Sequence, residues 1–104
     1  MRNIVKLILI ITALTLGGID CFAANISRGR DLSRRWCSGC HLVAPDQQSI
    51  IVFTAPFASI AQRPNFNARE LSASLLTSHP QMQDRALSRD EAADIAAYIA
   101  SLRK

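Results

Sequence analysis

The chain has few of the residues that mark linkers or a second folded unit. Its 104 residues include four glycines and four prolines, and no segment is repeated. These absences argue against flexible linkers and an additional module, so we expect one small domain. No basic run is interleaved with aromatic residues, so the net charge of +4 gives little support for nucleic-acid binding, and we expect none.

A long apolar run occurs at one place, over residues 7–16 near the N-terminus. Arg2 and Lys6 precede the run and small residues follow it, which is the pattern of a secretory signal peptide. The run is shorter than the roughly 20 residues of a comfortable membrane-spanning helix, so a retained membrane anchor is the weaker alternative. We therefore expect no stable membrane insertion after the leader is removed.

The chain contains three cysteines, and removal of the predicted leader would leave two. We expect cleavage after Ala23 or one residue later, which gives a signal peptide over residues 1–23 and a domain over residues 24–104. Cys21 leaves with the leader. The two remaining cysteines lie in one motif, so we expect no structural disulfide.

That motif is a pentad at residues 37–41, Cys-Ser-Gly-Cys-His. Two cysteines three residues apart with a histidine directly after the second are the attachment signature of a c-type haem. The thiols of Cys37 and Cys40 become thioether links, and His41 becomes an axial iron ligand. A zinc site needs four ligands, but no second Cys-x-x-Cys is present, and a thioredoxin-like dithiol belongs in a βαβ pattern that the chain lacks.

The first helix of the domain is expected over residues 27–37, running into the pentad, with Asn25 or Ser27 as its N-cap. Gly29 lies in its interior, where glycine costs about 1 kcal/mol against alanine. Another helix pressing against the backbone would explain Gly29, and a tolerated surface glycine is an equal alternative.

The middle of the chain is expected to hold short elements. Residues 50–53 have the local propensity of a strand, but a lone strand has no partner, so we expect an extended segment over one face of the haem. A helical turn over residues 58–62 follows. A longer helix is capped by Asn67 and ends near residue 77, because Pro80 disfavours helical geometry in the residue before it.

The last helix has the clearest signals. Ser88 and Glu91 form a capping box at its start, and Arg103 with Lys104 favour its negative end. Alanines along the helix permit a close approach by a partner helix, which should lie across the apolar stripe. The stripe consists of Ile95, Tyr98, Ile99 and Leu102.

Taken in order, these segments resemble small class I cytochromes c of bacteria. The likeness extends over essentially the whole domain and rests on Gly29, the pentad, residues 55–61, residues 79–82 and the terminal helix. It implies an all-α cytochrome c fold, with three to four short helices around one covalently attached haem c. The first and last helices are then expected to cross, with Gly29 and Tyr98 at the contact.

The resemblance also implies the iron ligands. His41 is the proximal ligand and Met82, in the loop before the last helix, is the distal ligand. The backbone carbonyl of Pro56 is expected to accept a hydrogen bond from the other ring nitrogen of His41, and Pro45 is the weaker candidate for this role. Because Gln83 stands where the family often has proline, His79 is an alternative distal ligand, and an open or water-bound position is another.

The implied function is single-electron transfer between redox partner proteins in the periplasm of a Gram-negative bacterium, without enzymatic activity. Four arginines on the first helix either guide an acidic partner or form a solvated face. Two alternatives remain open. In the first, the chain is a cytochrome subunit of a periplasmic dehydrogenase. In the second, Met82 does not bind the iron and the chain is a five-coordinate haem sensor or peroxidase.

Overall fold

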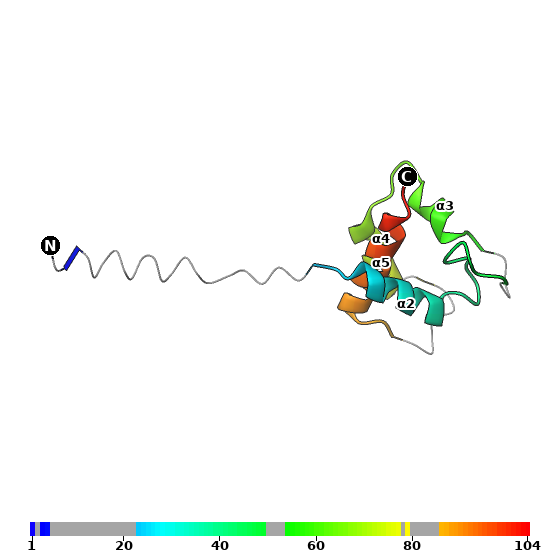
Figure 1. Ribbon diagram of the computed structural model, residues 1–104, viewed down its shortest axis with the longest axis horizontal. Coiled ribbons are helices and arrows are strands. Elements are labelled where there is room, and N and C mark those ends of the chain that lie inside the picture. Colours follow the sequence, from blue (N-terminus) through cyan, green and yellow to red (C-terminus); the bar gives the residue numbers. More distant parts are fainter. Residues whose placement is uncertain (2, 5–22, 50–53, 78, 80–85) are drawn as a thin grey trace.

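The computed structural model describes residues 1, 3–4, 23–49, 54–77, 79 and 86–104, and the regular structure in these ranges is helical. This confirms the all-α prediction. Most of the predicted leader, the apolar segment 50–53 and Met82 lie outside the described residues. Within the described ranges, no helix combines the length and apolar character that a membrane crossing requires. The helices are α2 (Ile26–Trp36), α3 (Phe57–Ala61), α4 (Ala68–Thr77) and α5 (Arg89–Ser101) (Figure 1).

Helix α2 begins at Ile26, one residue before the predicted start. The side chain of Asn25 accepts a hydrogen bond from the Arg28 amide at 2.9 Å, so Asn25 is the N-cap of the two candidates. The helix ends at Trp36, and the amide of Cys37 still donates to the Ser33 carbonyl at 2.9 Å. The pentad therefore starts at the C-cap of α2.

Helix α2 crosses α5 at Gly29 (Figure 1). A Cβ added to Gly29 would lie 1.9 Å from the carbonyl oxygen of Asp94 and 3.0 Å from the Cβ of Tyr98. Real Cβ atoms do not approach backbone oxygen that closely, so only glycine permits this distance between the helices. The predicted contact between Gly29 and Tyr98 is confirmed, and it includes the backbone of α5 itself.

Helix α5 supplies more of the buried apolar residues than any other described helix. Ser88 accepts a hydrogen bond from the Glu91 amide at 3.1 Å, and the Glu91 carboxylate accepts one from the Ser88 amide at 3.0 Å, which confirms the capping box. Arg103 lies beyond the end of the helix and donates to the carbonyl of Ala61, which ties the C-terminus to α3. Three members of the predicted stripe are buried and the fourth is half-buried: Ile95, Tyr98, Ile99 and Leu102.

The two helices of the middle region also lie close to their predicted positions. Helix α3 is one residue earlier than expected, because the carbonyl of Pro56 already accepts bonds from the amides of Ser59 and Ile60. Asn67 caps α4 by accepting from the amides of Arg69 and Glu70 at 2.9 and 3.1 Å. Both helices contact α5, and α4 turns Leu71 and Leu75 toward the core.

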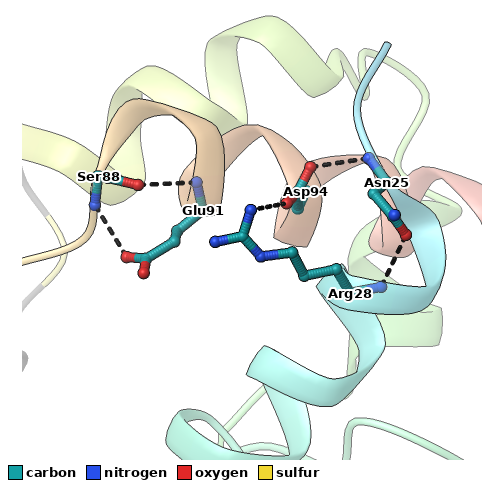
Figure 2. A network of polar contacts seen from close by, with 5 residues as sticks. All are labelled: Asn25, Arg28, Ser88, Glu91 and Asp94. Carbon is teal, nitrogen blue, oxygen red and sulfur yellow. Dashed lines mark hydrogen bonds and ion pairs between the residues drawn. The ribbon is translucent and has the colours of Figure 1, made fainter. Parts of the chain in front are cut away.

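A buried carboxylate joins the start of α2 to the middle of α5 (Figure 2). Asp94 is 5% exposed, and its Oδ1 accepts a hydrogen bond from the Asn25 amide at 2.7 Å. Its Oδ2 lies 3.5 Å from Nη1 of Arg28. The same residue thus contributes its carbonyl to the contact with Gly29 and its carboxylate to the helix start.

We expect Gly29→Ala to destabilise the protein by about 2 kcal/mol or more, because the new methyl group forces α2 away from α5. The sign is opposite to the gain of about 1 kcal/mol that alanine brings to an open helix position. Gly39→Ala is the control, since a Cβ there meets nothing within 4 Å. Chemical unfolding of the haem-loaded variants measures both effects, and a stabilising Gly29→Ala would contradict the close crossing.

Asp94 and Arg28 should differ in their effect on stability. Asp94→Ala leaves the Asn25 amide without its acceptor and should cost about 2 kcal/mol. Arg28→Ala should cost less than about 1 kcal/mol, because more than half of the Arg28 side chain is exposed and the ion pair is screened. Asp31→Ala, at an exposed position of α2, is the control in chemical unfolding. Equal losses for Asp94→Ala and Arg28→Ala would show that the ion pair dominates instead.

Candidate haem site

The pentad continues α2 by one further turn. The amide of Cys40 donates to the Cys37 carbonyl at 3.2 Å, and the amide of His41 donates to the same carbonyl at 2.9 Å. Residues three and four apart on a helical turn share one face. Cys37, Cys40 and His41 therefore present two thiols and an imidazole on the same side of the chain.

The two cysteines do not have the character of a redox-active dithiol. Neither forms a disulfide, Cys37 is 8% exposed and Cys40 is half-buried. Burial, and then the neighbouring Cys40, raises the pKa of the Cys37 thiol to about 11. A catalytic dithiol requires the opposite, a thiolate stabilised near neutral pH. Within the described residues, no group of three or more His, Cys, Asp or Glu side chains is arranged to hold a metal ion.

His41 is held through one ring nitrogen. Its Nδ1 lies 2.7 Å from the carbonyl oxygen of Ala55. A carbonyl only accepts, so Nδ1 carries the proton and Nε2 of the neutral ring has a lone pair for a metal. The predicted acceptor, the carbonyl of Pro56, is wrong by one residue. As the N-cap of α3, Pro56 directs its carbonyl to the amides of Ser59 and Ile60 instead.

Thr54, for which the sequence raised no expectation, adds a second contact to the same nitrogen. Its Oγ1 lies 3.0 Å from Nδ1 of His41 and donates a hydrogen bond to the Cys40 carbonyl. Because the hydroxyl proton is used on Cys40, the oxygen is an acceptor toward His41. The available signal is the position of Thr54, directly before Ala55 and Pro56 in a segment that the resemblance places beside the haem.

Aromatic packing fixes the His41 ring relative to the core. The rings of His41 and Phe57 have centroids 5.2 Å apart, and the rings of Phe57 and Tyr98 have centroids 6.5 Å apart. The Tyr98 hydroxyl donates to the Val43 carbonyl at 2.6 Å. Phe57, Tyr98 and Val43 are all buried, so an apolar layer connects α5 to the imidazole.

Gln47 closes the loop after the pentad, and no sequence signal identified it. Its Oε1 accepts from the Val43 amide at 2.8 Å, and its Nε2 donates toward the carbonyls of Ser38 and His41 at 2.8 and 3.0 Å. The side-chain amide of Gln47 therefore provides hydrogen bonds that hold this loop together in the absence of a helix or strand between the pentad and residue 49.

Of the two candidate distal ligands, the structure describes His79 and does not describe Met82. Met82 lies outside the described residues, so its role remains a prediction. His79 is described and exposed, and its ring centroid lies 6.1 Å from that of His41. Together, the paired thiols and an imidazole with a directed Nε2 match the donor set that covalent haem attachment requires.

Comparison with curated proteins gives a relative along nearly the whole chain. The sequence is 44% identical over 96 residues to the protein named Cytochrome c-552 of Bradyrhizobium diazoefficiens, and the match covers 92% of each chain. No family model matches, and no solved structure gives a significant match. At this identity and coverage the two chains share a family, so this chain belongs to the small class I c-type cytochromes and carries covalently bound haem c.

Proposed function

We propose that this cytochrome is a periplasmic carrier of single electrons, with His41 as the proximal and Met82 as the distal ligand of one haem iron. When bound, the haem supplies a one-electron couple between ferric and ferrous iron. The chain holds the haem through Cys37 and Cys40, orients the proximal imidazole and surrounds it with apolar side chains. The leader over residues 1–23 is part of the proposal, since it directs the domain to the periplasm.

The observation that carries the proposal is the hydrogen bond from Nδ1 of His41 to the Ala55 carbonyl. It supports an imidazole that is fixed in orientation, with Nε2 as the ring nitrogen left to bind iron. Such a ring suits a permanent axial ligand, because its orientation is set by the backbone before the metal binds.

Met82 completes the proposed coordination from the loop between α4 and α5. A thioether sulfur is a soft, neutral ligand that favours ferrous iron, and buried apolar groups such as Phe57 disfavour the extra charge of ferric iron. Both effects raise the reduction potential. Six-coordinate iron also has no vacant position for a substrate, which favours electron transfer over enzymatic activity.

Electron carriers meet redox partner proteins briefly and under electrostatic steering. Two arginines of α2 are engaged within the chain. Arg34 donates to both carboxylate oxygens of Asp46, at 2.9 and 3.1 Å, which holds the pKa of Asp46 below its usual range, and Arg28 pairs with Asp94. We therefore assign the guidance of an acidic partner to the exposed Arg30 and Arg35. Stable co-purification with a larger oxidoreductase would instead favour a subunit role.

Met82→Ala should abolish the weak near-infrared absorption band that a methionine sulfur gives to ferric haem. Gln83→Ala is the matched control, because it changes the same loop without removing a sulfur, and it should retain the band. Absorption spectra of the purified oxidised proteins provide the measurement. If the unmodified protein lacks the band, or if its reduced form binds carbon monoxide at once, the proposed coordination is wrong.

Thr54→Val should raise the reduction potential by an amount on the order of tens of mV and lower the free energy of unfolding by about 1 kcal/mol. The substitution removes one acceptor from Nδ1 of His41, so the imidazole becomes a poorer donor to ferric iron. Thr54→Ser keeps the hydroxyl and should restore both values. Redox titration and chemical unfolding are the measurements, and an unchanged potential in Thr54→Val would contradict the role of the hydroxyl.

A further inference from the structure

A second imidazole lies beside the proximal one. The ring centroids of His41 and His79 are 6.1 Å apart, with an angle of 52° between the ring planes. These are the two histidines of the chain, and they are 38 positions apart in the sequence (79 − 41 = 38). The fold therefore brings together the two strongest neutral nitrogen donors that the sequence offers.

The separation is that of two imidazoles that share one metal ion. A metal–imidazole bond is about 2 Å long, and the ring centroid lies about 1 Å beyond the nitrogen. Two rings on opposite sides of one ion then have centroids about 6 Å apart. Tilted ring pairs in protein interiors have centroids about 4.5–7 Å apart, so the observed 6.1 Å is compatible with both a ring contact and a shared ion.

The surroundings of His41 limit where that ion lies. Its Nδ1 is bound to the Ala55 carbonyl, and its ring packs against Phe57, so Nε2 is the donor that remains for a metal. His79 is exposed, and its ring lies next to that of His41. Its position is set by α4, which packs against α5 and ends at Thr77, two residues before His79.

We propose that His79 is a second imidazole ligand of the haem iron and takes the distal position whenever Met82 does not hold it. This inference rests on the proposed function for His41. His79 and Met82 are three positions apart in the sequence, so an extended chain spans at most about 10 Å between them. A single axial position admits one of the two side chains at a time.

The test compares Met82→Ala with the double variant Met82→Ala/His79→Asn, both purified with haem attached. Met82→Ala should remain low-spin, with the electron paramagnetic resonance and near-infrared signature of two imidazoles, and the double variant should become high-spin. Because the chain contains two histidines, a second imidazole within one molecule comes from His79. Met82→Ala/Gln81→Ala is the control for loop changes and should keep the bis-imidazole spectrum.

A binding measurement gives the size of the effect. Added imidazole competes with His79, so Met82→Ala should bind it at least about tenfold more weakly than the double variant does. If Met82→Ala fails to accumulate, Met82→Leu removes the sulfur while keeping a side chain of similar volume. Optical titration at several protein concentrations should give one affinity, as an internal ligand requires.

Several results would overturn the proposal. These are a high-spin Met82→Ala variant, a low-spin double variant, equal imidazole affinities, and a low-spin spectrum that disappears on dilution. The proposed Met82 ligation fails on a different observation, the absence of the sulfur band from the unmodified protein. If that band is absent and His79→Asn alone gives high-spin iron, His79 ligation is supported and Met82 ligation is overturned.

Discussion

The approach of α2 to α5 at Gly29 is the constraint on which the rest of the domain depends. At this point one backbone lies directly against another, with no side chain between them to adjust the distance. The carboxylate of Asp94 then fixes the start of α2 in the same place, through the Asn25 amide. With its start and its middle both fixed on α5, α2 can end in one position only, and that end carries the pentad.

The haem site is assembled from both sides of this crossing. From α5, Tyr98 holds the Val43 carbonyl and packs on Phe57, which in turn packs on His41. From the loop, the carbonyl of Ala55 and the hydroxyl of Thr54 fix the nitrogen of His41 that does not bind iron. The imidazole is thus positioned by segments from three parts of the chain, and each acts on a different edge or face of the ring.

Local signals made much of this arrangement predictable. The pentad, the capping box of Ser88 and Glu91, and the interior Gly29 each depend on a few neighbouring residues. The role of Asp94 was missed because its hydrogen bond joins residues 69 positions apart, and a lone acidic residue on a helix is usually solvated. The carbonyl that accepts from His41 belongs to Ala55 and not to the predicted Pro56. The sequence gives no signal for the direction of a backbone carbonyl, and the start of α3 decides which carbonyl is available.

The His41–His79 contact belongs to the same class of long-range information. Nothing in the local sequence of His79 distinguishes a ligand from a loop residue before proline. Its significance comes from the packing of α4 on α5, which carries the end of α4 back toward the pentad. The structure therefore places one of the coordination alternatives, His79, beside His41, and Met82 stays a prediction.

The burial of Cys37 also determines how reactive its sulfur is. Thioether formation consumes the sulfur as a nucleophile, and thiolate is the reactive form of cysteine. With a pKa of about 11 in the folded chain, only about one Cys37 in ten thousand is ionised at neutral pH. In the packed chain an unattached Cys37 is therefore a weak nucleophile, so the burial that accompanies the placement of the pentad also protects this sulfur from disulfide exchange.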